Sequence, residues 1–443
     1  MKKRKACFIG EVVVAEALAE VFSGTDLAIE KKEENRFLSD KKSGDFHIIF
    51  LDLDGDPALQ EEAAVSERVA KLTQKNRKVI TFSSRGDFDL IRAAYHAGAK
   101  DHIVKPFNHR ELITRVFAVI ENKRRICCVG GGTGLFSVLS CLKSLPGVLL
   151  ISLVSMSDDG GSSGRLRSSF GVLPPGDIRR SLVALSNAPE VMNAIIQHRF
   201  ERGGELKDHS VGNLILTALA ESTGSMAEAV RALGDILNIQ GVVLPISTVL
   251  TNLVAEFEDG TVIRGESHIS RGEGRDANLR VKKVWHEPEA ECDASAYACL
   301  LHADLLIIGP GDLFSSVITN LIIPKVKEAV LLAKGKKIYI CNLMTRPGET
   351  SGLNAPDHVE KINETVGADF LDQVIVSSTR FTEEAIAEYA KLMQQPVLPG
   401  EPKRWRELTR AKVIFSDIAD EKILVRHDPQ KLRKELLNEI RRL

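Results

Sequence analysis

The segment ICCVGGGTGLFSVL (residues 126–139) decides the fold of the larger part of this chain. A short apolar stretch leads into four glycines within five residues, and an apolar helical pattern follows, which predicts a strand, a tight turn and a helix. Glycines let a phosphate approach the backbone, and a helix N-terminus offers unpaired N–H groups. The turn therefore predicts an anion site at Gly131, Gly132, Thr133 and Gly134, with a purely structural turn as the alternative, because the spacing fits neither a P-loop nor a dinucleotide fingerprint.

The order of an apolar strand followed by a polar or glycine-rich loop continues downstream of that segment. Strand-like runs at 148–156, 303–309 and 336–342 each end in a loop rich in Gly, Pro, Ser, Asp or Asn. Between the first two runs lie a mostly helical stretch over 177–239 and the pair Asp259-Gly260, whose alternating apolar flanks predict a hairpin. We therefore expect a Rossmann-like, doubly wound α/β domain with a helical insert over residues 125–443.

Residues 1–122 repeat the alternation on a smaller scale. The apolar runs ACFIG, FHIIFL, RKVITF and DHIVKPF are each followed by an amphipathic stretch. This order predicts a receiver-sized, flavodoxin-like domain with a parallel sheet and helices on both faces. The charged stretch at 121–125 separates it from the strand that opens the larger domain.

The composition excludes several classes of function. Of the 443 residues, 44% are hydrophobic and 27% charged, as in globular proteins, and a formal net charge of −1 with 5% aromatic residues argues against nucleic acid as a partner. No apolar run approaches the ~18 residues that cross a bilayer, and Glu11 and Glu16 interrupt what would be a signal peptide. We expect a cytoplasmic protein without a membrane partner, whose seven cysteines are buried thiols because none has metal-site spacing.

Candidate ligand residues lie in loops at the carboxyl ends of the predicted strands, where open parallel sheets bind ligands. The loop at 157–167 combines carboxylates, hydroxyls and arginines, which suits a sugar hydroxyl or a metal beside a phosphate; a solvated turn is the alternative. Asp177 is placed either to cap the helix that follows it or to meet a ligand. The candidates are Asp158, Asp159, Gly160, Ser162, Arg165, Pro175, Asp177, Asn213, Gly309, Gly311, Phe314, Ser315 and Asn342.

Motifs of nucleophilic and zinc catalysis are missing. The chain has no GxSxG, no HExxH and no Cys-His family signature. His209, in the helical insert near Asn213, is expected to be structural rather than catalytic. The loops together favour a phosphorylated, nucleotide-like ligand.

Ordered motifs from residue 126 to the C-terminus resemble the gluconeogenesis factor family (YvcK-like), a branch of the superfamily that includes 2-phospho-lactate transferase (CofD). They are GGGTGLFSVL, SDDGGSSGRLR, LPPGDIRRSLVALS, DHSVGNLIL, ADLLIIGPG, ICNLMTRPGET and RHDPQKL. The resemblance implies a cytoplasmic bacterial protein with a Rossmann-like core, no established reaction, and a UDP-sugar ligand such as UDP-N-acetylglucosamine. It also implies a link to cell shape and cell-wall morphogenesis during gluconeogenic growth.

Three departures from the family pattern concern the ligand. Asp312, Phe314 and Ser315 stand in a loop that usually reads GPGSLYTS, and an added carboxylate disfavours a phosphate unless a metal or an arginine is near. Arg346 replaces a usual Gln. Leu135 and Phe136 follow the glycine loop where transferase relatives often carry Lys, which disfavours the transferase activity.

Residues 1–122 resemble a response-regulator receiver domain. The resemblance assigns Asp52 as the phospho-acceptor, Ser83 as the hydroxyl position and Lys105 as the lysine that pairs with the phosphoryl group. Receivers hold Mg²⁺ with an acidic pair after the first strand, but Gly10 and Glu11 stand there, leaving Glu11 and Asp52 as candidate ligands. A degenerate receiver used to dock a protein partner or to form a homodimer is favoured over a phosphorylated switch.

Three functional hypotheses follow from the sequence. The leading one is a regulatory protein that binds a nucleotide-sugar, with no certain cofactor and with the role of Mg²⁺ left open. The second is a Mg²⁺-dependent transferase of phosphate-containing groups, in which Asp158 and Asp159 hold the metal. An NAD-type oxidoreductase ranks last, because the glycine spacing is wrong and no acid–base residue is placed for hydride transfer.

Overall fold

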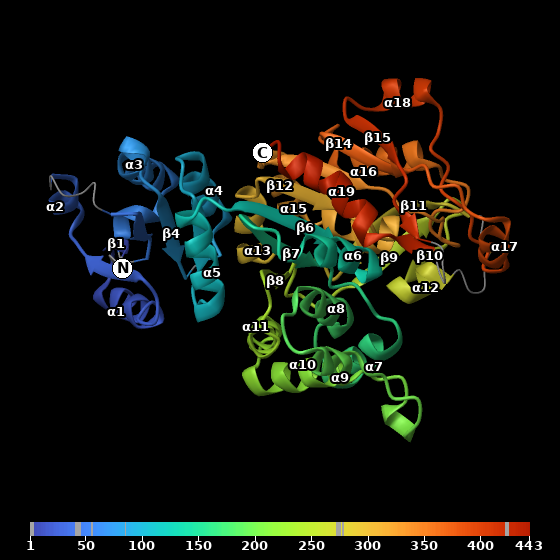
Figure 1. Cartoon of the computed structure of the whole chain (residues 1–443), viewed down its shortest axis with the longest axis horizontal. Helices are drawn as coiled ribbons and strands as arrows, with labels where there is room; N and C mark the ends of the chain where they lie inside the picture. Colours follow the sequence, from blue (N-terminus) through green and yellow to red (C-terminus); the bar gives the residue numbers. More distant parts are fainter. Residues whose placement is uncertain are drawn as a thin grey trace. The chain divides into compact units, whose positions relative to one another are not determined.

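The computed structural model of the chain describes residues 4–39, 46–54, 56–84, 86–271, 276, 279–420 and 425–443. It divides into two compact units, each with its own parallel sheet (Figure 1). The first unit consists of residues 1–125, 147–149 and 293–303, and the second of residues 126–146, 150–292 and 304–443. The first break lies close to the expected boundary, whereas residues 293–303 fall inside the segment that the sequence assigns to the larger domain.

The first unit has the strand order β2-β1-β3-β4-β5, which is the flavodoxin-like order. Successive residues of a strand face opposite sides of a sheet, and accordingly Ala6 and Phe8 join one apolar core while Cys7 and Ile9 join the other. The strands are β1 (Arg4–Ile9), β2 (Leu27–Lys31), β3 (Ile48–Asp52), β4 (Val79–Ser83) and β5 (Asp101–Val104). The longer helices are α1 (Val12–Val21), α2 (Glu34–Ser39), α3 (Glu62–Thr73), α4 (Phe88–His96) and α5 (His109–Ile120).

Helix α13 (Ala294–Leu301) completes the first unit although it lies far along the chain. It packs against α4 and β5, and seven of its eight residues are buried. Two pairs of rings connect this segment to α4, and the ring centroids are 5.0 Å apart in each pair. Phe88 packs against Tyr297 of α13, and Tyr95 packs against His302, which directly follows α13. Tertiary packing, rather than sequence order, assigns this helix to the first unit.

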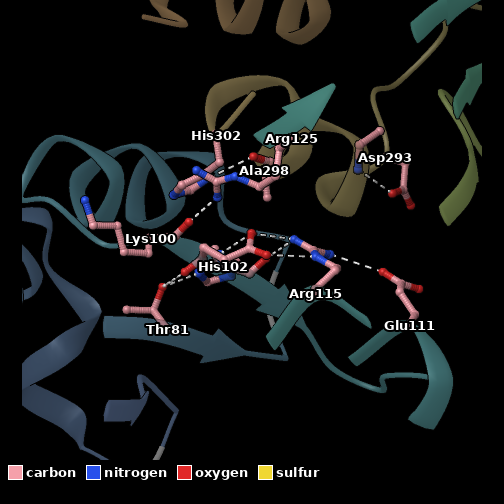
Figure 2. A network of polar contacts seen from close by, with 11 residues as sticks. Thr81, Lys100, His102, Glu111, Arg115, Arg125, Asp293, Ala298 and His302 are labelled. Atoms are coloured by element: carbon pink, nitrogen blue, oxygen red, sulfur yellow. Dashed lines mark hydrogen bonds and ion pairs between the residues drawn. The ribbon is translucent and has the colours of Figure 1, made fainter. Parts of the chain in front are cut away.

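A buried polar network lies between α5, β5 and α13, with Arg115 at its centre (Figure 2). Arg115 is 1% exposed and donates to both carboxylate oxygens of Asp101, at 3.0 and 2.7 Å, and to Glu111 at 3.1 Å. Burial opposes the ionisation of Asp101, but the Arg115 guanidinium outweighs it and lowers the pKa of Asp101 to about 2. The network is therefore a fully desolvated ion pair inside the first unit.

The second unit has the strand order β15-β14-β13-β12-β6-β7-β8. Counted along the unit this is the doubly wound order 3-2-1-4-5-6 with one strand added, so the order reverses between β6 and β12. The strands are β6 (Arg124–Gly130), β7 (Val148–Val154), β8 (Val242–Pro245), β12 (Leu305–Ile308), β13 (Lys336–Ile340), β14 (Gln373–Ser377) and β15 (Lys412–Ser416). The predicted fold class is confirmed for this unit.

The helical insert lies between β7 and β8, as predicted, and its helices group together (Figure 1). They are α7 (Gly161–Phe170), α8 (Pro175–Leu185), α9 (Glu190–Gln197), α10 (Val211–Thr223) and α11 (Met226–Ile236). The predicted hairpin at Asp259-Gly260 is confirmed, because β9 (Asn252–Phe257) pairs antiparallel with β10 (Val262–Arg264), and β11 (Val281–Glu287) pairs with β9 on the other side.

The remaining elements cover the sheet of the second unit and its edges. They are α6 (Gly132–Leu142), α12 (Glu266–Arg271), a π-helical turn (Leu313–Ile318), α14 (Thr319–Leu321), α15 (Pro324–Leu332), α16 (Ala355–Val366), α17 (Glu383–Lys391), α18 (Pro402–Leu408), α19 (Pro429–Ile440), β16 (Ala419–Asp420) and β17 (Arg426–His427). Among the described residues, no helix combines the length and apolarity that a bilayer span requires. All seven cysteines are buried, as expected, and none of them forms a disulfide within the described residues.

Candidate functional site

A cavity of about 560 Å³ opens where the strand order of the second unit reverses. It is lined by the loops after β6, β7, β12 and β13, by the start of α8 and by part of the helical insert. These loops are far apart in sequence, and the parallel sheet brings them together because its strands all end at one edge. The volume is typical of a small-molecule site.

Most of the predicted ligand residues line this cavity. They are Gly131, Gly132, Thr133, Gly134, Asp158, Gly160, Ser162, Asp177, Asn213, Gly311, Ser315 and Asn342. Five others do not line it: Asp159, Arg165, Pro175, Gly309 and Phe314. The convergence of the loops is thus seen in the structure, while ligand binding by their residues stays a prediction.

Two of the five point elsewhere because the loop at 157–167 is partly helical. Helix α7 begins at Gly161, so Arg165 lies on its exposed side, where it donates to the backbone carbonyls of Glu205 and Lys207. Asp159 accepts a hydrogen bond from the backbone N–H of Ser267, at 2.7 Å, and so holds the start of α12.

The carboxylate of Asp177 occupies the glycine loop. The expected capping role is wrong, because α8 begins at Pro175 and Asp177 lies within its first turn. Its Oδ2 instead accepts the backbone N–H of Gly132, at 2.8 Å, and its Oδ1 accepts from Arg180 at 2.7 Å. A Cβ on Gly131 would lie 2.3 Å from the same Oδ2, so glycine is required there by an internal carboxylate.

A second carboxylate occupies the N-terminus of the π-helical turn after β12. Glu349, which is 1% exposed, accepts the backbone N–H groups of Phe314 and Ser315, each at 3.2 Å. It also accepts the hydroxyls of Ser315, at 2.9 Å, and Ser270, at 2.7 Å. Phe314 is buried beneath this arrangement and does not line the cavity.

Asp158 and Asp159 do not form a metal-binding pair. Asp158 lines the cavity and accepts the Gly160 N–H at 2.9 Å, while Asp159 turns to Ser267. Burial and the neighbouring Asp177 raise the pKa of Asp158. Within the part of the chain that the structure describes, no three His, Cys, Asp or Glu side chains are arranged to hold a metal ion.

Other acidic side chains gather in one part of the cavity. Glu266 and Asp312 both line it. Burial, followed by Glu349 and Asp158, raises the pKa of Glu266 to about 8, and burial with Glu349 raises that of Asp312 to about 6. The added carboxylate at 312 therefore lies among acids, with Arg346 as its nearest cation at 3.7 Å.

Four arginines and one histidine of the cavity were missed by the sequence analysis; burial lowers the pKa of the histidine, His427, to about 4, so its ring is neutral. Arg179, Arg180 and Arg199 line it, as do Arg426 and His427. The motifs LPPGDIRR and RHDPQKL contain four of these five residues, and that was the available signal. No local pattern distinguishes them from solvent-exposed basic residues.

His209 positions Ser162 near the N-terminus of α7. Its Nδ1 lies 2.9 Å from the Ser162 hydroxyl, and Asn213 Nδ2 donates to the same hydroxyl at 3.1 Å. Burial and nearby arginines lower the pKa of His209, which favours the neutral ring. The arrangement agrees with a structural role for His209.

In the receiver-like unit, Lys105 lies between two carboxylates, an arrangement called the lysine clamp below. Lys105 Nζ lies 2.8 Å from Asp52 and 2.6 Å from Asp54. A Cβ on residue 10 would lie 2.4 Å from Asp52 Cβ, so an acid cannot replace Gly10 without a shift, and Glu11 is exposed. Lys105 thus supplies a counter-charge to the buried Asp52 carboxylate, and Mg²⁺ binding by Glu11 and Asp52 stays a prediction.

The hydroxyl of Ser83 is also engaged within this unit. It lies 3.1 Å from Nε2 of His102, whose Nδ1 lies 2.8 Å from Thr81 Oγ1. His102 is fully buried, and burial lowers its pKa to about 3, so the ring is neutral. Whether Asp52 accepts a phosphoryl group stays a prediction.

Residues 126–418 match the protein family described as "2-phospho-L-lactate transferase CofD". The chain belongs to the CofD family. Among its relatives are proteins named "Gluconeogenesis factor". The one from Bacillus subtilis (strain 168) is 43% identical over 277 residues, which are 62% of this chain and 85% of that protein. The one from Halalkalibacterium halodurans is 36% identical over 316 residues, 71% of this chain and 96% of the relative. The resemblance to the gluconeogenesis factors is thereby confirmed.

Two solved structures are similar to different parts of this CofD-family chain. A UPF0052 family protein from Bacillus halodurans matches 71% of this chain and 99% of its own, with 37% identity and a TM-score of 0.67. A response regulator from Thermotoga maritima matches 27% of this chain and 98% of its own, with 22% identity and a TM-score of 0.23. The receiver-like fold of the first unit rests on its strand order.

Proposed function

We propose that this protein is a cytoplasmic regulatory protein that binds a UDP-sugar-like nucleotide in the cavity of its second unit. The observation that carries the proposal is the shared cavity of about 560 Å³ at the strand-order reversal, lined by twelve of the predicted ligand residues. Its relatives named "Gluconeogenesis factor" support a role linked to carbon metabolism. The link to cell-wall morphogenesis is part of the proposal, as is a protein partner or a second copy of the chain bound through the receiver-like unit.

Calorimetric titration tests the ligand. UDP-N-acetylglucosamine, UDP-glucose and GDP are titrated into the full chain, with UMP as the control that lacks a diphosphate. We expect saturable heat with the UDP-sugars and a weaker response to GDP and UMP. Absence of heat with all four nucleotides would overturn the proposal.

A second candidate function is a transferase of phosphate-containing groups, and one observation favours it. Asp158 and Asp177 lie close enough for their carboxyls to interact, and the arginines that line the same cavity could stabilise charge that develops on a transferred phosphate group. Mg²⁺ would be held by Asp158 with Asp177 rather than Asp159. Nucleotide release from UDP-sugars in the presence of Mg²⁺ is the measurement, and Asp158→Asn should abolish it while Asp159→Asn, outside the cavity, reduces it less.

A further inference from the structure

The anion sites expected at the helix N-termini are already filled. Asp177 accepts the first N–H of α6, and Glu349 accepts two N–H groups of the π-helical turn. A ligand phosphate at either place would meet a carboxylate at hydrogen-bonding distance from the same donors, and like charges disfavour each other there. The phosphate of the proposed ligand therefore needs another partner in the cavity.

Arg179 is a buried cation without a partner. It lines the cavity but is only 7% exposed, and its Nε has no hydrogen-bond acceptor. Within the described part of the chain, its guanidinium makes no hydrogen bond or ion pair. Burying an unpaired charge is unfavourable, and an anionic ligand in the cavity would supply the counter-charge that Arg179 needs.

The surroundings of Arg179 add to the positive potential. Burial and the neighbouring Arg180 and Arg199 lower the pKa of Arg179 to about 10, which leaves it charged at neutral pH. Two acids act on Arg179: Asp177 already pairs with Arg180 and Gly132, and Asp158 accepts the Gly160 N–H and has a raised pKa, caused mainly by burial. The positive charge therefore exceeds the negative charge at this corner of the cavity.

Two further residues shape this corner. A Cβ on Gly212 would lie 2.8 Å from Arg179 Cδ and 2.7 Å from Ile196 Cγ2, so glycine makes room for the arginine. Asn213 is 1% exposed, and its Oδ1 has no partner, so it can accept a hydrogen bond from a ligand hydroxyl or N–H. The corner offers a cation and an acceptor side by side.

We propose that Arg179, with Arg199 and Asn213 beside it, forms the subsite that holds a phosphoryl oxyanion of the ligand, while the glycine loop positions Asp177. The planar guanidinium suits two oxygens of one phosphate. Asp312 and Glu266, which also line the cavity, can then form hydrogen bonds with hydroxyl groups of the ligand. This inference deepens the proposed function, since it states which residues read the phosphate.

The test uses pyrophosphate as the probe, because it carries the anion without base or sugar. Its affinity is measured by calorimetry for the wild-type chain, for Arg179→Met and for Arg202→Met, an exposed arginine of the same insert. We expect R179M to bind pyrophosphate at least about tenfold more weakly, as for the loss of a charged hydrogen-bonding partner, and R202M to match the wild type. UDP-N-acetylglucosamine is titrated in parallel.

Thermal unfolding without ligand separates a binding role from a structural one. Met fills a similar space without charge, so R179M should melt at the same or a higher temperature than the wild type, while the shift caused by pyrophosphate disappears. A marked drop in the melting temperature would show that Arg179 supports the fold and would overturn the inference. If R179M does not fold, Arg179→Lys, which keeps the charge but loses the planar fork, is expected to weaken binding less.

The remaining outcomes distinguish this inference from the proposed function. Pyrophosphate binding that depends on Arg179, without any binding of the UDP-sugar, supports the subsite and removes the nucleotide-sugar proposal. UDP-sugar binding without pyrophosphate binding overturns the subsite and leaves the nucleotide-sugar proposal intact. Equal pyrophosphate affinity in wild type and R179M also overturns the subsite.

Discussion

Glu266 is the residue whose protonation should be visible in the stability of the whole chain. Its pKa is raised from 4.5 to about 8 by burial and neighbouring acids. Between these two pH values the folded protein holds a proton that the unfolded chain has released. The contribution to stability is therefore full below about pH 4.5, falls as the pH rises towards 8, and is lost above it.

Replacing Glu266 with Gln removes this dependence. The melting temperature of E266Q, relative to the wild type, should rise between about pH 5 and pH 8 and then level off, because only the wild-type carboxyl must stay protonated in that range. Thermal unfolding at several pH values is the measurement. Glu67→Gln is the control, since Glu67 is exposed and its pKa is lowered rather than raised. A difference that does not change with pH would contradict the expectation.

We expect Lys105 to stabilise the first unit. Its ammonium lies between the buried Asp52 and the carboxylate of Asp54, which raise its pKa despite the opposing effect of burial. Lys105→Met leaves Asp52 buried without a counter-charge and should destabilise the first unit by about 3 kcal/mol. Calorimetric unfolding of the full chain measures it. Lys71→Met, which breaks an exposed pair on α3, should leave the transition unchanged. A K105M chain as stable as the wild type would show that the clamp is dispensable.

At the scale of elements, α6 and the loop after β12 approach each other at one glycine. A Cβ on Gly134 would lie 2.2 Å from the carbonyl oxygen of Pro310 and 2.7 Å from its carbonyl carbon. Backbone atoms cannot move away through a change of rotamer, as a side chain can. Gly134 is thus needed for packing between two elements, beside its place in the cavity wall.

Gly134→Ala should separate these two elements. We expect a loss of stability of about 1–3 kcal/mol, in the range of overpacked cores, together with weaker ligand binding in the cavity. Calorimetric unfolding and titration give both quantities. Gly24→Ala is the matched control, because no atom lies within 4 Å of a Cβ at that position. An unchanged melting temperature in G134A would mean that the loop after β12 can move to accommodate the added methyl group without a loss of stability.

At the scale of the whole molecule, the first unit is assembled from three separate segments of the chain. Helix α13 packs against α4 and β5 in this unit, and the ion pair of Arg115 and Asp101 lies near enough to act on Cys299 of this helix. Removing one partner of a fully buried pair leaves an uncompensated charge and costs about 3–5 kcal/mol. The place of α13 therefore depends on charges that lie almost two hundred positions earlier in the chain.

Asp101→Asn should loosen α13 in the full chain. Hydrogen exchange is expected to rise in residues 294–301, while α10 in the second unit keeps its protection. Asp89→Asn, on the exposed side of α4, is the control and should leave both helices unchanged. Unaltered exchange in 294–301 with D101N would mean that the apolar contacts alone hold α13.

Much of the fold could be predicted from local patterns in the sequence. The strand, glycine turn and helix at 126–139, the helical insert and the hairpin at Asp259-Gly260 all follow from periodicity and turn chemistry within one short window. The family motifs added the loops of the cavity. Periodicity also produced the alternation of strands and helices in both units, because each element must bury one face.

Only the tertiary structure shows which charged side chains and helices come into contact. The sequence by itself determined the two parallel-sheet folds and the loops at their carboxyl edges. It could not show that Asp177 and Glu349 fill the helix N-termini, that Arg179 is buried without a counter-charge, or that α13 joins the first unit. Local patterns depend on neighbours along the chain, whereas pairing and desolvation of charges depend on atoms brought close only by the folded sheet.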